Sequence, residues 1–302
     1  MSILRNKTVL LALKLLVSGS LLTYVLTKAG VGSVLSLLGR IRPGSFVLAV
    51  FMFLCMIFLG SVRWRYLLPG RFSLRKLLPL YLLGSFFNTF MPGLVGGDVV
   101  KIYYLYKETG QGKQALASVF MDRYMGFFAL MLLGMAAWPF GLRYFAGTWI
   151  EWLLPLIVLL FLAGSLLVLW LRLGKRFGVL NEIYEYFHTY RKQRGVMAKA
   201  LGLSALIQTL SIFMVFVLAR GLGQHIAPLV LFIFVPIIST LASLPLSISG
   251  IGIREAATVF LLGTQGVDAE TATAISFAWF LAMAAAGLAG LYEYLKTRGA
   301  KG

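Results

Sequence analysis

The segment Asn-Thr-Phe-Met-Pro-Gly-Leu-Val-Gly-Gly-Asp at residues 88–98 interrupts an otherwise apolar stretch of the chain. It places an amide, a proline, three glycines and a carboxylate within eleven residues, with apolar sequence on both sides. A backbone N–H or C=O that faces lipid without a partner is costly, so irregular backbone at membrane depth is tolerated where it is buried in protein or lines a cavity. The segment therefore predicts a helix break inside a membrane protein.

A similar break follows at residues 245–255, Pro-Leu-Ser-Ile-Ser-Gly-Ile-Gly-Ile-Arg-Glu. The two breaks lie in the middle of the apolar stretches 77–112 and 227–266. A helix from Leu77 to Asn88 would be about 18 Å long at 1.5 Å per residue, which crosses roughly half of a bilayer core. Each stretch therefore predicts a re-entrant helical hairpin, and we expect the two hairpins to form related halves of one site.

Composition excludes a soluble globular domain, because 60% of the residues are hydrophobic, 13% are charged and the mean hydropathy is +0.88. Apolar runs of about 20 residues indicate spanning helices rather than strands. We expect an all-α integral membrane protein, a polytopic helical bundle that forms one transmembrane domain over residues 1–302, with its first helix retained. The expected spans are Thr8–Lys28, Ser45–Val62, Ala115–Trp138, Ile150–Leu171, Ala198–Ala219 and Thr271–Leu295.

The distribution of positive charge predicts an orientation. With the N-terminus cytoplasmic and each hairpin returning to its own side, 20 of the 28 Lys and Arg residues are cytoplasmic and residues 28–44 form an external loop. This topology predicts the cell inner membrane, with both termini cytoplasmic. Residues 45–138 and 198–295 then run oppositely through the membrane as an inverted repeat, which is a transporter architecture.

Residues 172–197 connect the two units and are basic. Leu180, Ile183, Tyr184 and Phe187 share one helical face at i, i+3, i+4 and i+7 spacing. We expect a cytoplasmic amphipathic helix that contacts anionic head groups.

The first break offers a candidate binding site. Gly96 and Gly97 predict a glycine turn that opens a helix, with Asp98 as its N-cap and Lys101 one turn further along. One interpretation is that the helix start binds a phosphate. The other is that the glycines only permit a tight hairpin and Asp98 only caps the helix. Asn88 would satisfy broken backbone or contact a substrate.

Two adjacent charged pairs, Asp122 with Arg123 and Arg254 with Glu255, lie within apolar segments, where ionised groups usually mark function. They would bind a substrate, with both arginines converging on one cavity, or they would pair among themselves and brace the hairpins. The sequence shows no metal-ligand spacing, no nucleophile beside a base and no nucleotide-binding loop. We therefore expect no metal, no cofactor and no enzymatic activity.

Three motifs stand together in the chain: Asn88-x3-Pro92-Gly93-x2-Gly96-Gly97-Asp98, Ala117-Ser118-Val119 with Asp122-Arg123, and Pro245-x4-Gly250-x-Gly252-x-Arg254-Glu255. This set resembles the lysylphosphatidylglycerol synthase transmembrane family, the flippase-like domain of the multiple peptide resistance factor. The resemblance covers nearly the whole chain, and it implies that lipids are moved between leaflets. We expect a stand-alone member without the soluble synthase domain, since the chain ends soon after its last expected helix.

The expected function is therefore a flippase-like transporter of an anionic lipid or lipid-linked head group: a phospholipid, an aminoacyl-phospholipid or a polyprenyl-phosphate sugar. The formal net charge of +18 favours an anionic partner. A membrane-embedded transferase acting on lipid head groups, and a small-solute or ion carrier, stay open as alternatives. The expected partners are anionic membrane lipids and no nucleic acid, with a homodimer left open. In the expected site the phosphate is attracted by Lys101, Arg123 and Arg254, while Asn88, Asp98, Asp122 and Glu255 hold these bases and bind sugar or amine.

Overall fold

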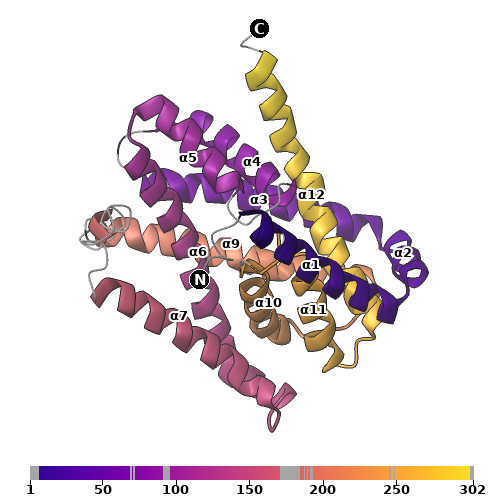
Figure 1. Ribbon diagram of the computed structural model, residues 1–302. Coiled ribbons are helices and arrows are strands. Elements are labelled where there is room, and N and C mark those ends of the chain that lie inside the picture. The colour runs from indigo at the N-terminus through magenta and orange to yellow at the C-terminus, as the bar shows by residue number, and fades with distance from the viewer. Residues whose placement is uncertain are drawn as a thin grey trace.

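The computed structural model describes residues 7–68, 70, 72–90, 96–170, 184–186, 188, 190, 193–244, 246–247 and 249–299 (Figure 1). Its regular elements in these ranges are all helices, which confirms the all-α fold class. In chain order they are α1 (Lys7–Ala29), α2 (Val31–Gly39), α3 (Pro43–Leu67), α4 (Leu74–Phe90), α5 (Gly96–Thr109), α6 (Gly112–Gly141), the short 3-10 helices η2 (Leu142–Tyr144) and η3 (Trp149–Trp152), α7 (Leu153–Trp170), α9 (Arg194–Gly221), α10 (Pro228–Ser243), α11 (Ile253–Gly263) and α12 (Ala269–Gly299).

Five helical segments are long and apolar enough to cross a membrane, and they coincide with five of the six expected spans. This confirms a polytopic membrane protein. The segments are Pro43–Leu67, Gly112–Tyr144, Trp149–Leu167, Arg194–Gly221 and Ala269–Lys296.

Helix α1, of 23 residues, covers the first expected span Thr8–Lys28. Its segment Lys14–Ala29 passes as a candidate span together with α2, and the two helices are bent by 77° at Gly30, whose φ of 72° suits glycine. The region 28–44, expected to be an external loop, contains α2. The apolar face of α2 explains this, because Val34 is buried in a cluster with Ala29 and with Ala274 of α12.

The two predicted breaks separate short helices. Helices α4 and α5 have 17 and 14 residues, and α10 and α11 have 16 and 11, so that none is long enough to count as a span by itself. Helix α4 packs against α5, and α10 packs against α11. The re-entrant course of both hairpins stays a prediction. Of the motif residues at the breaks, Pro92, Gly93 and Pro245 lie outside the described residues.

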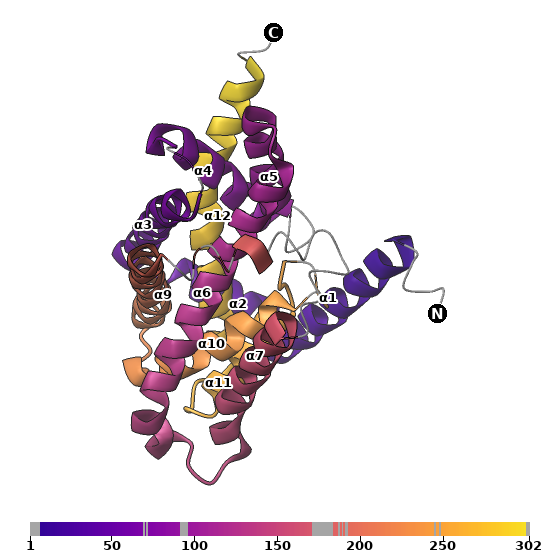
Figure 2. The same ribbon diagram turned by 90° about the vertical axis from the view of Figure 1, so that its left-hand side faces the viewer.

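The predicted repeat units have the same order of elements, a long helix, two short helices and a long helix: α3 to α6, and α9 to α12. The two first helices, α3 and α9, pack against each other along their length (Figure 2). Helix α4 of the first unit packs on α12, and α10 of the second unit packs on α6. A duplication related by a two-fold axis predicts this reciprocal packing, while the inversion across the membrane stays a prediction.

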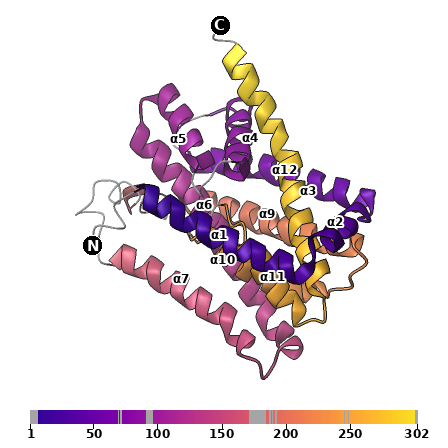
Figure 3. The same ribbon diagram turned by 45° about the vertical axis from the view of Figure 1, so that its right-hand side comes forward.

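Helix α10 lies in the centre of the main hydrophobic core. Seven of its apolar side chains are at most 1% exposed and pack among residues of α6, α9, α11 and α12: Val230, Leu231, Ile233, Phe234, Val235, Ile237 and Ile238. By contrast, α7 lies at the edge of the bundle and α1 crosses in front of α11 (Figure 3). The exposed leucines of α7 suit contact with lipid tails.

The connecting segment between the units is only partly described. Leu180, Ile183 and Phe187 of the expected apolar face lie outside the described residues. Tyr186 and Tyr190, one helical turn apart, are buried, and they pack in one cluster with Leu67 of α3 and Met121 of α6. The Tyr186 hydroxyl donates to the Leu67 carbonyl oxygen. Burial raises the pKa of both phenols.

Candidate functional site

A cavity of about 290 Å³ lies between the two units. Its wall combines apolar residues with an unusual number of polar and charged side chains for a membrane interior. The volume is at the lower end for a small-molecule site, so the cavity fits a head group and not a whole lipid. It is lined by Phe53, Met56, Ile57 and Arg63 of α3; Tyr81, Ser85, Asn88 and Thr89 of α4; Lys101 of α5; Asp122, Arg123, Gly126 and Phe127 of α6; Ile207, Gln208 and Ser211 of α9; and Met283 of α12.

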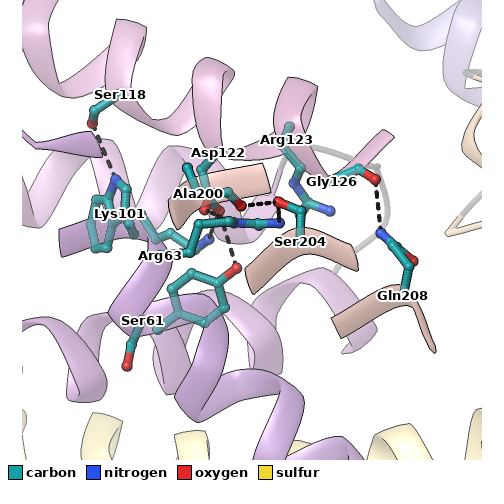
Figure 4. Close-up of polar contacts among 12 residues, drawn as sticks. Ser61, Arg63, Lys101, Ser118, Asp122, Arg123, Gly126, Ala200, Ser204 and Gln208 are labelled. Atoms are coloured by element: carbon teal, nitrogen blue, oxygen red, sulfur yellow. Dashed lines mark hydrogen bonds and ion pairs between the residues drawn. The ribbon is translucent and has the colours of Figure 1, made fainter. Parts of the chain in front are cut away.

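Arg63 and Asp122 form a buried ion pair in the wall of this cavity (Figure 4). Arg63 Nε donates to Asp122 Oδ1 at 2.7 Å, and Arg63 Nη1 donates to Ser204 Oγ of α9 at 2.9 Å. The Tyr81 hydroxyl donates to Asp122 Oδ2 at 3.0 Å. Asp122 is 1% exposed and Arg63 is 5% exposed, so that each charge depends on the other for its compensation.

Two glycines make room for this network. A Cβ at Gly60 of α3 would stand 2.5 Å from the Tyr81 hydroxyl oxygen, and one at Gly126 of α6 would stand 3.2 Å from Arg63 Nη1. Both glycines therefore act through the absence of a side chain.

Lys101 is the most enclosed cation of the site. It is 3% exposed, and its ammonium lies 3.8 Å from the centre of the Tyr81 ring and 5.6 Å from that of Trp64. The carboxylates near it are more distant than in a charge-assisted hydrogen bond, at 3.5 Å for Asp98 Oδ1 and 4.0 Å for Asp122 Oδ2. The aromatic faces partly replace the water that burial removes.

Arg123 pairs with Asp98 of α5 and not with its neighbour Asp122. Arg123 Nε and Nη2 donate to Asp98 Oδ2 and Oδ1 at 2.8 and 3.1 Å, which is a forked pair. Asp98 is the third residue of α5, so its expected role as the N-cap is wrong. About half of the Arg123 side chain, 48%, is exposed, whereas Asp98 is buried. Arg123 thus presents charge at the border of the cavity.

Gly96 and Gly97 begin α5, and Gly97 is the point where α5 crosses α4. A Cβ at Gly97 would overlap the carbonyl oxygen of Gly84. The Gly97 N–H donates to Asn88 Oδ1 at 3.0 Å, so that this amide is already used within the hairpin. These contacts favour the interpretation in which the glycines permit close packing and Asn88 satisfies broken backbone.

Arg254 and Glu255 lie in a separate cluster at the start of α11, and neither lines the cavity. Arg254 Nη2 donates to Glu255 Oε1 at 2.9 Å, and the Ser276 hydroxyl of α12 donates to the same oxygen at 3.0 Å. The Gly252 N–H donates to Glu255 Oε2 at 2.7 Å. The Arg254 guanidinium lies 5.2 Å from the centre of the Phe280 ring. The expected convergence of Arg123 and Arg254 on one cavity is therefore not observed.

The charged groups around the cavity do not balance. Its cationic side chains are Arg63, Lys101 and Arg123, and the carboxylates that contact them are Asp98 and Asp122. The cluster therefore carries one surplus positive charge when all five groups are ionised. Among the residues that the structure describes, no group of His, Cys, Asp and Glu side chains is placed to hold a metal ion.

Sequence reasoning missed Arg63, Tyr81 and Gln208. Arg63 follows the expected end of its span and resembles an interfacial charge, but α3 continues to Leu67 and carries it into the protein. Gln208 donates to the Gly126 carbonyl oxygen at 3.1 Å. Its amide in the middle of an apolar helix was the available signal, because polar groups in spanning helices usually face the protein interior.

Fold and site together define a polytopic helical membrane protein with a cationic cavity between its helices. The chain belongs to the family described as the lysylphosphatidylglycerol synthase transmembrane region, whose model matches residues 11–290.

Two similar proteins are named only as UPF0104 membrane proteins. One, from Methanothermobacter thermautotrophicus, is 23% identical over 288 residues, which cover 82% of each chain. The other, from Pyrococcus horikoshii, is 24% identical over 176 residues, which are 56% of this chain and 50% of that protein. No solved structure matches the chain.

Proposed function

We propose that this protein is a flippase-like transporter, and not an enzyme, that moves an anionic lipid or lipid-linked head group between the leaflets of the cytoplasmic membrane. The observation that carries the proposal is the surplus positive charge at the cavity. Burying a positive charge without a full counter-charge inside a membrane protein is expensive, and such groups usually mark a substrate pathway. A bound phosphate would compensate the charge. The family membership supports a role connected with membrane lipids.

The geometry around Arg123 supports a lipid rather than a water-soluble ion. Arg123 lies on α6 one turn from the exposed Phe120 and one turn from the partly buried Phe127, so an apolar surface borders the guanidinium. The cavity holds only the volume of a head group. In this arrangement the acyl chains stay against the apolar helix faces while the phosphate enters, which avoids transferring them into water.

The topology that belongs to this proposal has both termini cytoplasmic and the two repeat units inverted. It rests on the sorting of Lys and Arg residues along the sequence. Inverted units around a central site allow the cavity to open alternately to the two sides. The expected partners are anionic membrane lipids.

Lipid translocation in proteoliposomes tests the proposal. Purified protein is reconstituted, a phosphatidylglycerol labelled on its acyl chain is added, and the fraction reached by a membrane-impermeant reductant is followed in time. We expect faster translocation than in empty liposomes, and a loss of roughly tenfold or more in Arg123→Gln, because hydrogen bonds to a charged group contribute about 1.5–3 kcal/mol. Arg143→Gln, at an exposed arginine of η2, is the matched control and should retain the rate.

The alternatives give different results in the same preparation. A head-group transferase would change the mass of the lipid, and a solute carrier would leave the labelled lipid in place while accumulating a soluble anion. Wild-type translocation no faster than in empty liposomes, with the protein folded, would refute the proposed function.

A further inference from the structure

Each carboxylate oxygen of the cavity cluster already accepts a hydrogen bond from a donor within the cluster. Asp122 Oδ1 accepts from Arg63, and Asp122 Oδ2 accepts from Tyr81. Both oxygens of Asp98 accept from Arg123. An incoming ammonium group could reach only the remaining lone pairs of these oxygens, and it would approach Lys101, which lies within 3.5 Å of Asp98 and 4.0 Å of Asp122. The cluster therefore disfavours an amine, because the amine would place a second positive charge beside Lys101.

The Lys101 ammonium is the group best placed to receive an anionic oxygen. It borders the cavity, carries three N–H donors and is nearly fully buried. Its nearest described carboxylate contacts, at 3.5 and 4.0 Å, exceed the 2.7–2.9 Å of a strong ionic hydrogen bond. An anionic oxygen in the cavity would supply a closer partner and would neutralise the one surplus charge.

The remaining polar wall is neutral. Asn88 uses its Oδ1 on the Gly97 N–H and Gln208 uses its Nε2 on the Gly126 carbonyl oxygen. The Asn88 Nδ2 is a donor and the Gln208 Oε1 is an acceptor, and either atom can pair with a hydroxyl. Ser85 and Ser211 line the same cavity. Neutral amides and hydroxyls recognise a polyol, and they do not compensate a second positive charge.

We propose that the cavity selects a lipid head group with one net negative charge, free hydroxyls and no ammonium, such as a glycerol or sugar phosphodiester, and that it rejects zwitterionic and aminoacylated head groups. This rests on the proposed function. A phosphodiester leaves the cluster neutral, whereas a zwitterionic head group leaves the surplus charge in place and a lysylated one adds to it. Like charges brought together in an interface cost several kcal/mol, so we expect a preference of roughly tenfold or more.

Head-group competition in the wild-type protein tests the selection without any variant. Acyl-labelled phosphatidylglycerol, phosphatidylethanolamine and lysylphosphatidylglycerol are compared for translocation in liposomes of one common composition. The midpoint of thermal unfolding in detergent is measured with short-chain forms of the same lipids and with glycerol phosphate, since a ligand that binds only the folded state raises it. We expect phosphatidylglycerol to move at least about tenfold faster than the two amines and to give the larger thermal shift.

Lys101→Gln removes the surplus charge and keeps both ion pairs, so the preference for phosphatidylglycerol over phosphatidylethanolamine should fall several-fold. Lys107→Gln, at an exposed position of the same helix, is the matched control and should keep the wild-type ratio. Equal movement of phosphatidylglycerol and phosphatidylethanolamine by the wild type would overturn the head-group inference alone. Movement of no lipid, with glycerol phosphate binding in its place, would instead overturn the proposed lipid function.

Discussion

Gly97→Ala tests whether the hairpin of α4 and α5 positions the cavity. The added methyl group would overlap the Gly84 carbonyl oxygen and stand 2.7 Å from Asn88 Cγ, and the backbone atom cannot rotate away. Overpacking of this kind costs about 1–3 kcal/mol. Alanine keeps the backbone N–H, but the methyl group displaces Asn88, and the weakened hydrogen bond between the two costs about another 1 kcal/mol. We expect the free energy of unfolding to fall by about 2–4 kcal/mol.

The measurement is denaturant titration in mixed micelles, read by tryptophan fluorescence. Gly202→Ala in α9 is the control, because a Cβ there would meet nothing within 4 Å and alanine favours a helix over glycine by up to about 1 kcal/mol. The control should be unchanged or more stable. A Gly97→Ala protein as stable as the wild type would refute the close crossing of α4 and α5 on which the position of Lys101 depends.

Three further predictions concern ion pairs and topology. Asp122→Asn should lower the free energy of unfolding by about 3–5 kcal/mol, because Arg63 stays buried without its counter-charge, and Arg63→Met in the same chain should recover much of the loss. Glu255→Ala should lower the free energy of unfolding by a similar amount in the same titration, and adding Arg254→Ala should largely restore it. The double variant should still translocate lipid; if its translocation is abolished, Arg254 has a role in transport. Single cysteines are placed at Gly223 and at Gln193 in a Cys55→Ser background and treated with an impermeant thiol reagent from outside. The cysteine at Gly223 should react and the one at Gln193 should stay protected, and external labelling at Gln193 would refute the inverted repeat.

The long helices could be predicted from the sequence, and their ends could not. Span Ser45–Val62 corresponds to α3, which begins at Pro43 and continues to Leu67. An apolar run marks where lipid contact requires hydrophobic side chains. A helix can continue into polar sequence where other parts of the protein supply hydrogen-bond or ion-pair partners for the polar side chains. Arg63 is the example: it lies beyond the apolar run, and Asp122 and Ser204 receive it inside the bundle. Hydropathy does not report such partners.

The ion pairs show a second limit of sequence reasoning. Adjacent helical residues project about 100° apart, so Asp122 and Arg123 face different neighbours. Asp122 points to α3 and α4, and Arg123 points to α5. Arg254 and Glu255 do pair although they are adjacent, because they lie in the first turn of α11, where Glu255 also accepts from the Gly252 N–H. The sequence identified the charged residues, but their partners follow from helix packing.

The two units use equivalent positions differently, and this difference bears on the mechanism. Asp98 and Glu255 are each the third residue of a short helix, and the residue 25 positions further on is Arg123 in one unit and Phe280 in the other. In the second unit the cation is Arg254, which neutralises Glu255 beside it and lies over the Phe280 ring. The first unit holds Lys101 in addition to its two complete pairs. Charge would therefore direct an anion to the first unit, while the neutral pair of the second unit is suited to brace its hairpin. For the proposed transport of an anionic lipid, this difference predicts that the hairpins move around a fixed cationic site, rather than that the phosphate passes from one arginine to the other.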